Sequence, residues 1–257
     1  MTFDFKQIGF SLESTLDGSP TLRLIDRLPN SEKPAESMHH SGGAATETIY
    51  IYGEPLKQAM LLAKDKSIEP HLLKTCIVGL GLGYIEMCWA KACYEMETLG
   101  TCDSFEVVEG LKEQFLNWLS HPSEKSVYQL CLEKLGIHHR EEVLKTLQHN
   151  FLNSNHFFSD LLNTEKYKKN KWNFICYDAF SKKTNDQLWD ENFLTTWLEK
   201  HSEEDCVFMT YACTGSLKRA LQKNGFVFVK RPGFQGKRDA TIAFKGIYKD
   251  FDLNLFT

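Results

Sequence analysis

The feature that most constrains the fold is a regular alternation between short apolar runs and helical stretches, which begins near Thr75 and continues almost to the end of the chain. The apolar runs are rich in β-branched, aromatic and cysteine residues, as strands buried on both faces are. The stretches between them repeat apolar side chains every three or four residues, which is typical of helices. Strands that alternate with helices form a mostly parallel sheet covered on both faces, so the sequence predicts an α/β fold.

Residue patterns place the individual elements in this part of the chain. The expected strands are 76–78, 105–108, 156–158, 174–177, 206–209, 226–229 and 241–244. The expected helices are 84–92, 109–119, 127–135, 140–151, 187–200 and 214–223. Thr214 can cap the last helix at its start, and Gly225 can adopt the left-handed conformation that often follows a helix. The last two strands follow one another directly, which predicts an antiparallel pair at the edge of the sheet.

The first 70 residues differ from the rest, and we expect them to form a β-rich N-terminal extension to a main domain over residues 71–257. Residues 21–25 alternate as a strand does, and residues 46–52 carry the β-branched and aromatic side chains that favour a second strand. Residues 55–64 have helical spacing. The start of the chain lacks the apolar segment of a signal peptide, and no apolar run approaches the roughly 18 residues of a membrane span.

The composition is that of an ordinary folded domain. Hydrophobic residues make up 42% and charged residues 25% of the 257 residues. The formal net charge of −4, from 30 Lys and Arg against 34 Asp and Glu, excludes a chain that binds nucleic acid through overall positive charge, so such binding requires a local basic patch. The 8 cysteines are scattered without a CxxC pair, which indicates free thiols in a cytoplasmic protein and no metal site.

A glycine-rich turn, Gly79-Leu80-Gly81-Leu82-Gly83, lies between the first strand and the first helix of the main domain. Glycines in such a turn let the backbone bend sharply and approach a ligand closely near a helix N-terminus. The spacing is neither the GxGxxG of dinucleotide-binding folds nor a phosphate-binding P-loop. A GxGxG turn at this position is the shape that cradles the methionine part and the ribose of S-adenosylmethionine. We therefore expect Gly79, Gly81 and Gly83 to contact this cofactor, and the alternative is a purely structural turn.

Acidic residues follow the next strands. A carboxylate after the second strand can accept hydrogen bonds from both hydroxyls of a ribose. Glu106 and Glu109 are both candidates, and we prefer Glu109 because it lies where strand should give way to helix. Asp160 follows the third strand, where it either accepts the amine of adenine or caps a helix. Asp178 ends the fourth strand, and a carboxylate there can orient an amine beside the ring of Phe180.

The second half of the chain carries an ordered series of motifs. They are Asp178-Ala-Phe180, Leu188-Trp189, the segment from Thr210 to Arg219 (TYACTGSLKR), Gly225-Phe226 and the segment from Pro232 to Arg238 (PGFQGKR). In order and spacing, this series resembles the MnmC-type tRNA methyltransferase domain. Three earlier segments look like the same family, at residues 38–44, 47–52 and 79–83. The resemblance covers roughly residues 36–244.

The resemblance implies a Rossmann-like fold of the class I S-adenosylmethionine-dependent methyltransferases, with a seven-stranded, mostly parallel sheet. It implies transfer of a methyl group from S-adenosylmethionine to the amine of 5-aminomethyl(-2-thio)uridine at the wobble position of tRNA, giving the methylaminomethyl base. In two-enzyme fusions of this family an FAD-dependent oxidoreductase domain follows. Because this chain ends at Thr257, we expect a stand-alone methyltransferase that uses neither FAD nor a metal.

The resemblance also implies partners and residue roles. The expected partners are the tRNA anticodon arm and, transiently, the enzyme that supplies the aminomethyl-uridine, with no membrane contact. Asp178 is expected to be catalytic, as a carboxylate that takes a proton from the substrate amine or orients it, and Glu47 is expected to bind the cofactor. Phe180 and Trp189 are candidates to stack a flipped base, although Trp189 equally suits a core position. The candidate phosphate contacts are Lys182, Lys183, Lys218, Arg219, Lys230, Arg231, Lys237 and Arg238.

The chain departs from the family pattern after Asp178. The loop over residues 181–188 lacks both of the prolines that are frequent in the family, so we expect this loop to be more mobile. Two other functions stay open at this point. A small-molecule N-methyltransferase would share the glycine turn and the acidic residue but needs no basic mouth. A tRNA-binding relative without catalysis would keep the fold but not turn over the cofactor.

Overall fold

The computed structural model describes residues 3–25, 36–66, 68, 72–98, 100–154, 156–236 and 239–250. Its strands are β1 (Phe10–Ser14), β2 (Pro20–Leu24), β3 (Lys74–Val78), β4 (Thr101–Phe105), β5 (Phe157–Phe158), β6 (Trp172–Tyr177), β7 (Ser202–Thr210), β8 (Val227–Arg231) and β9 (Ala240–Lys245). Its α-helices are α1 (Ala44–Thr48), α2 (Glu54–Asp65), α3 (Tyr84–Glu95), α4 (Glu109–Ser120), α5 (Val127–Lys134), α6 (Arg140–Gln148), α7 (Glu191–His201) and α8 (Gly215–Lys223). Two of the predicted phosphate contacts, Lys237 and Arg238, lie outside the described residues.

Seven strands form one sheet in the order β5-β4-β3-β6-β7-β9-β8. Neighbouring strands from β5 to β7 pair in parallel, whereas β9 pairs antiparallel with both β7 and β8. The predicted α/β fold, with a mostly parallel, seven-stranded sheet and an antiparallel terminal pair, is therefore confirmed. From β3 the chain moves to one side, to β4 and β5, and then crosses to β6 on the other side. This divergence leaves a crevice at the carboxyl ends of β3 and β6, where folds of this kind bind ligands.

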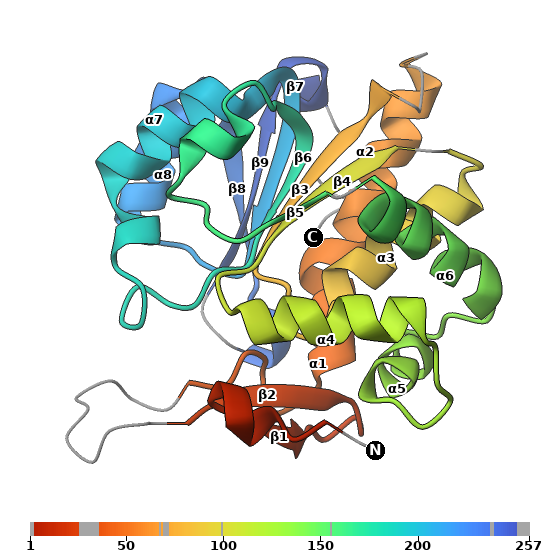
Figure 1. The fold of residues 1–257 in the computed structure, drawn as a ribbon. Coiled ribbons are helices and arrows are strands. Elements are labelled where there is room, and N and C mark those ends of the chain that lie inside the picture. The colour runs from red at the N-terminus through yellow and green to blue at the C-terminus, as the bar shows by residue number, and fades with distance from the viewer. Residues whose placement is uncertain are drawn as a thin grey trace.

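The sheet is buried on both faces, which explains why its strands are continuous apolar runs. Side chains along each strand alternate between two cores. In β6, Phe174 and Cys176 belong to one core, and Trp172, Ile175 and Tyr177 belong to the other. Helices α2, α3 and α6 cover the first face of the sheet, and α7 and α8 cover the second (Figure 1). The sheet is thus the middle layer of a three-layer structure.

The predicted strand over residues 46–52 is wrong. Helix α1 occupies the first part of this segment, and a π-helical turn over Ile49–Gly53 joins it to α2. The buried side chains here recur with a helical period: Ala44, Thr48, Ile51, Leu56, Ala59 and Ala63. The helical pattern outweighs the β propensity of the Thr, Ile and Tyr residues. Because α2 packs against α3, its apolar face belongs to the core of the main sheet.

The second strand of the sheet, β4, ends at Phe105 and so lies earlier in the chain than the predicted range of 105–108. Polar residues interrupt the apolar run of this strand, so the hydrophobic pattern did not indicate its true range. Asp103, for example, is buried within β4, and its carboxylate accepts a hydrogen bond from the indole N–H of Trp172 at 2.8 Å. Glu106 is therefore the first residue after the strand.

The antiparallel hairpin β1–β2 lies beside α1 and α4 (Figure 1). The turn between its strands is fastened to the start of α1. The carboxylate of Asp17 accepts hydrogen bonds from the Thr46 hydroxyl at 2.9 Å and from the Ser19 amide at 2.9 Å. The Ser19 hydroxyl accepts the amide N–H of Ala44 at 2.9 Å, so the hairpin caps a helix that has no capping side chain of its own.

Replacing Asp17 with alanine should loosen the hairpin from α1. Burial opposes the charged form of Asp17, but hydrogen bonds from Ser19, Thr15 and Thr46 outweigh it and lower the pKa to about 2. We expect Asp17→Ala to lower the free energy of unfolding by about 1–3 kcal/mol at neutral pH in urea denaturation. Because the folded-state pKa lies below the usual 3.8, this contribution is present above about pH 4 and is lost as the pH falls toward 2.

The matched control is Asp65→Ala, at an exposed position at the end of α2. This control should leave the unfolding curve nearly unchanged. Equal stability of the wild type and Asp17→Ala at neutral pH would contradict the role given to Asp17.

Candidate functional site

A cavity of about 210 Å³ opens at the carboxyl edge of the sheet. The segments that follow β3, β4, β5, β6 and β7 each contribute to its lining, and so does the segment before α1. One lining residue from each segment in turn is Gly79, Glu106, Asp160, Asp178, Tyr211 and His39. The cavity therefore lies at the switch point between β3 and β6, the usual ligand site of such sheets.

The glycine turn after β3 fits tightly against the loop after β6. Gly79 has a φ of +95°, which side-chain-bearing residues rarely adopt, and a Cβ atom on it would lie 2.6 Å from the carbonyl oxygen of Asp178. Gly79 and Gly81 line the cavity, whereas Gly83 is not part of its lining. A Cβ atom on Gly83 would lie 2.3 Å from the ring of Phe115, so this glycine lets α4 pack against the turn.

Of the two acidic residues after β4, the structure brings Glu106 into the cavity and leaves Glu109 outside its lining. Glu106 is 7% exposed, and its carboxylate accepts the amide N–H of Val108 at 2.8 Å and that of Gly81 at 3.3 Å. Burial raises the pKa of Glu106 above its ordinary value, although these amide donors oppose the shift. Glu109 begins α4 and forms an ion pair with Lys112 at 2.7 Å. The preference for Glu109 rested on the misplaced strand, and the geometry favours Glu106.

Asp178 is held at the cavity wall in one orientation. Its amide N–H donates to the carbonyl of Val78 at 2.8 Å, and its Oδ1 accepts a hydrogen bond from the hydroxyl of Tyr52 at 2.6 Å. Burial and the charge of Asp178 raise the pKa of Tyr52 well above 10, so the hydroxyl stays protonated and donates. The amide N–H of Tyr211 donates to the Tyr52 oxygen at 3.3 Å and fixes the phenol in turn.

The segment before α1 forms another wall of the cavity and is fastened to the loop after Asp178. Glu36 accepts hydrogen bonds from the amide and the hydroxyl of Ser181 at 3.0 and 3.1 Å, and from the hydroxyl of Thr184. Glu47, on α1, accepts the amide N–H of His40 at 2.6 Å. The Glu36 carboxylate therefore holds the loop that follows Asp178 by hydrogen bonds. This is the loop that lacks the two prolines frequent in the family.

The cavity is strongly acidic. Five carboxylates line it, from Glu36, Glu47, Glu106, Asp160 and Asp178, and its described lining includes neither Lys nor Arg. Asp160 also accepts the amide N–H of Leu162 at 2.8 Å, so it shapes its own turn while it lines the cavity. Such a lining favours a ligand that carries positive charge.

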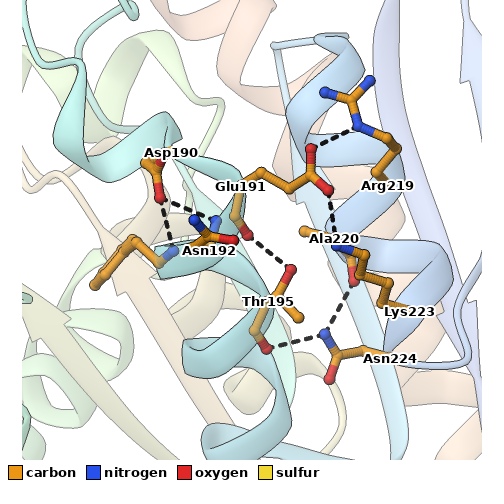
Figure 2. Close-up of polar contacts among 9 residues, drawn as sticks. Asp190, Glu191, Asn192, Thr195, Arg219, Ala220, Lys223 and Asn224 are labelled. Atoms are coloured by element: carbon orange, nitrogen blue, oxygen red, sulfur yellow. Dashed lines mark hydrogen bonds and ion pairs between the residues drawn. The ribbon is translucent and has the colours of Figure 1, made fainter.

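Two predicted contacts lie away from the cavity lining. Trp189 is 1% exposed and donates its indole N–H to the carbonyl of Phe180 at 2.7 Å, so it occupies a core position. Arg219, on α8, forms an ion pair at 2.5 Å with Glu191 of α7, which also binds Lys223 at 2.8 Å (Figure 2). This cluster joins the two helices on the outer face of the sheet.

Three further predicted contacts lie on or beside the loop after β6. Phe180 lines the cavity. Lys182 and Lys183 are exposed on the residues that follow it, and Lys182 forms an ion pair with Asp186 at 3.4 Å. Both lysines therefore lie outside the acidic cavity but close to the segment that forms its wall.

Sequence reasoning missed Tyr52, Tyr211 and Glu36, all of which line the cavity. Both tyrosines lie within motifs that carry the family resemblance, but the misassigned strand over residues 46–52 hid the direction of Tyr52. Glu36 acts through a hydrogen bond to Ser181, 145 positions away in the chain. No local pattern reports a contact of that range.

Comparison with known proteins gives one family and several relatives. Residues 124–246 match the model of a family described as S-adenosyl-L-methionine-dependent methyltransferase. The crystal structure of MNMC2 from Aquifex aeolicus superimposes with a TM-score of 0.61 at 21% identity, over 91% of this chain and 70% of that one, and so shares the fold. The bifunctional protein MnmC of Legionella pneumophila, named for tRNA 5-methylaminomethyl-2-thiouridine biosynthesis, is 32% identical over an alignment of 236 residues that covers 85% of this chain. The uncharacterized protein MJ0670 of Methanocaldococcus jannaschii is 27% identical over 235 residues, which is 91% of this chain.

The fold and the family match relate the chain to the S-adenosyl-L-methionine-dependent class of methyltransferases. Within this class the chain is related to the MnmC tRNA-modification enzymes, and the resemblance drawn from its motifs is confirmed. The chain spans 59% of the length of MJ0670 and 35% of the length of the Legionella protein.

Within the described residues, no helix combines the length and the hydropathy needed to cross a lipid bilayer. The same residues contain no group of three or more His, Cys, Asp or Glu side chains arranged to hold a metal ion.

The residues present fit S-adenosylmethionine. The sulfonium and ammonium groups of this cofactor are positively charged, which suits the acidic lining, and its ribose has two adjacent hydroxyls, which suit the buried carboxylate of Glu106. A Cβ atom on Gly81 would lie 3.1 Å from Sδ of Met38, which also lines the cavity. Glycine at this position therefore keeps the cavity open for a ligand.

The first turn of α3, next to the glycine turn, carries a carboxyl group that is fully buried. Oε1 of Glu86 accepts the hydroxyl of Ser104 at 2.7 Å, and Oε2 has no hydrogen-bond partner among the described residues. Burial raises the pKa of Glu86 to about 8, the carboxylates of Glu106 and Asp178 add to the shift, and the Ser104 hydroxyl opposes it. Glu86 is thus protonated at neutral pH.

The folded protein should lose stability as Glu86 ionises. Its folded-state pKa of about 8 exceeds the usual 4.5, so the folded chain holds a proton that the unfolded chain releases. We expect the free energy of unfolding of the wild type to fall by roughly 1 kcal/mol per pH unit between about pH 5 and about pH 8. Glu86→Gln should remove this slope, as measured by urea denaturation across that range.

The control is Glu113→Gln, on the exposed side of α4, which should keep the slope of the wild type. Parallel pH profiles for the wild type and Glu86→Gln would show that Glu86 does not carry the buried proton.

Proposed function

We propose that this chain transfers a methyl group from S-adenosylmethionine to the exocyclic amine of 5-aminomethyl(-2-thio)uridine at the wobble position of tRNA. The observation that carries the proposal is the convergence of the glycine turn, Glu106 and the Tyr52-bound Asp178 in one acidic cavity. The relationship to the MnmC proteins, whose names refer to 5-methylaminomethyl-2-thiouridine in tRNA, supports this choice of substrate. A cytoplasmic location follows from the same substrate.

Three carboxylates and one glycine would hold the cofactor. Glu106 accepts hydrogen bonds from the ribose hydroxyls, in place of Glu109. Asp160 offers a carboxylate to the adenine amine, and Glu47 offers one to the ammonium group of the methionine part. The turn at Gly79 lets the ligand approach the backbone. When bound, S-adenosylmethionine supplies a methyl group that its positively charged sulfur has already activated.

Asp178 is the residue that we assign to the substrate amine. A free alkylamine is mostly protonated in neutral water, and only the neutral form has the lone pair that methyl transfer requires. The carboxylate of Asp178 accepts the ammonium proton or a hydrogen bond from the amine and aligns the nitrogen with the methyl–sulfur bond. A nitrogen–carbon bond forms while the carbon–sulfur bond breaks, and the nitrogen then releases one proton.

Tyr52 is a positioning residue for this step. Its hydroxyl donates to Oδ1 of Asp178, so it favours the charged form of the carboxylate and fixes its orientation. Because Tyr52 is itself buried and bonded to the amide of Tyr211, the pair presents a carboxylate that needs no rearrangement when the amine arrives.

The tRNA backbone must be bound outside the acidic cavity, since phosphates and carboxylates repel one another. Lys182 and Lys183 are exposed next to the cavity wall and are suited to phosphate contacts. A small set of such contacts, on a chain with a net charge of −4, predicts tRNA binding that weakens as salt is added.

Nucleoside mass spectrometry of tRNA from cells that lack this chain tests the proposed function. We expect 5-aminomethyl bases to accumulate and the methylaminomethyl bases to disappear. Wild-type protein should restore the methylated base, and Asp178→Asn should not. An unchanged nucleoside profile in the deletion cells would exclude the proposed substrate.

Variants of the Asp178–Tyr52 pair test the assigned roles in the purified protein. Asp178→Asn should lower kcat by about 100-fold or more, because the carboxylate acts on the amine, and should leave the Kd for S-adenosylmethionine nearly unchanged in calorimetry. Tyr52→Phe should lower kcat by about ten-fold and shift the acid limb of the pH profile to higher pH, because the carboxylate loses a donor that favours its charged form.

The control for the tyrosine is Tyr128→Phe. Tyr128 is also buried, but its hydroxyl has no hydrogen-bond partner in the described part of the chain. This variant should keep both kcat and the pH profile of the wild type. A Tyr52→Phe variant whose pH profile matches that of the wild type would refute the positioning role.

A further inference from the structure

Of the two rings that the sequence offers for base stacking, Trp189 is buried in the core and Phe180 is half-buried in the cavity wall. The ring of Phe180 lies nearly parallel to that of Phe10, with 6.4 Å between the centroids. Trp189 is 1% exposed and packs edge-on against Tyr177 and Tyr211. Stacking of a second base, next to the one that reaches Asp178, requires further aromatic surface at the same edge of the sheet.

The loop between β8 and β9 reaches that edge. Strand β9 runs antiparallel to both β7 and β8, so β8 runs in the direction of the parallel strands. The chain therefore leaves β8 after Arg231 at the carboxyl edge and returns into β9 at Ala240. Figure 1 shows this blue loop beside α1, and the hydroxyl of Tyr50 donates to the carbonyl of Pro232 at 2.9 Å.

Three half-buried rings gather at this place, and we call His40, Tyr50 and Phe234 the aromatic platform. The ring of His40 meets that of Phe234 edge-on at 5.7 Å, and the ring of Tyr50 lies tilted to it at 6.3 Å. The platform adjoins the cavity, because the amide N–H of His40 donates to Glu47, which lines the cavity, at 2.6 Å.

A buried guanidinium lies against one ring of the platform, that of Tyr50. Arg231 is 6% exposed, its guanidinium carbon lies 4.5 Å from the centre of the Tyr50 ring, and its Nη1 donates to the carbonyl of Tyr50 at 3.2 Å. Its Nε has no hydrogen-bond partner among the described residues. The cation orders the ring of Tyr50 and adds positive charge beside an acidic cavity, which suits an aromatic ligand that also carries a phosphate.

We propose that the aromatic platform stacks an unpaired base of the RNA substrate next to the nucleotide whose amine enters the cavity. The proposal rests on the proposed function, since it takes RNA as the substrate. Stacking on rings is tolerant of base identity, so the platform fixes the position of the anticodon loop rather than its sequence. In this proposal Lys182 and Lys183 contact the phosphate backbone of the RNA, and the aromatic platform stacks one of its bases.

Binding of a fluorescent anticodon stem–loop, measured by anisotropy without cofactor, tests the platform. Phe234→Leu keeps an apolar side chain but removes the ring, and we expect it to weaken binding by about ten-fold while leaving the Kd for S-adenosylmethionine unchanged. Phe234→Trp, which restores an aromatic face, should bind as the wild type does. The control is Tyr94→Leu, another half-buried ring, which packs on His139 at 4.9 Å and is absent from the cavity lining.

The outcomes separate the platform from the function. If the wild type binds the stem–loop and Phe234→Leu binds equally well, the platform is refuted and the function stands. If the wild type binds no stem–loop at all, the proposed function fails as well. Photo-crosslinking of a 4-thiouridine-containing stem–loop to the full wild-type chain gives a second test that needs no variant. Crosslinks to the peptide around Phe234 would support the platform, and crosslinks confined to other segments would overturn it.

Discussion

The site depends on the close approach between the glycine turn after β3 and the loop after β6. The carbonyl of Asp178 lies where a side chain on residue 79 would begin, and the amide of Asp178 is bonded to the end of β3 through Val78. Only a residue without Cβ permits this contact, because a Cβ there would lie 2.6 Å from that oxygen. The contact places a carboxylate of one half of the sheet beside the glycine turn of the other half. Glu106, Tyr52 and Glu36 line the same cavity as the two residues of this contact.

The charge of the cavity is the second constraint. The proposed reaction brings together two cations, the sulfonium of the cofactor and the ammonium form of the substrate amine, which repel one another in a low-dielectric site. Five lining carboxylates offset that repulsion. The same carboxylates repel phosphate, so the RNA backbone must stay outside while a single nucleotide reaches in. An acidic cavity beside exposed lysines and an aromatic platform is consistent with that division of labour, and it explains how a chain with net negative charge could act on RNA.

Much of the architecture was predictable because both faces of the sheet are buried, so that strands are apolar runs and helices keep their period. Both ends of α8 followed their prediction in detail: at its start the Thr214 hydroxyl accepts the Leu217 amide N–H at 3.2 Å, and after its end Gly225 has a φ of +76°. The failures share a cause, which is that local propensity does not report distant partners. Residues 46–52 favour a strand by composition, but their buried side chains pack on α3. The polar Asp103 hid β4 because its partner, Trp172, comes from another strand, and that error moved the acidic candidate from Glu106 to Glu109. Tyr52 and Glu36 act only through contacts with loops far along the chain.

The most direct measurement is a crystal structure of the full chain with S-adenosylhomocysteine, the product that remains after methyl transfer. The account predicts both ribose hydroxyls within hydrogen-bond distance of the Glu106 carboxylate, the backbone of the glycine turn against the ligand, and the sulfur facing the side of the cavity that Asp178 lines. A ribose held by Glu109, or a ligand found elsewhere with side chains filling the crevice between β3 and β6, would contradict the account.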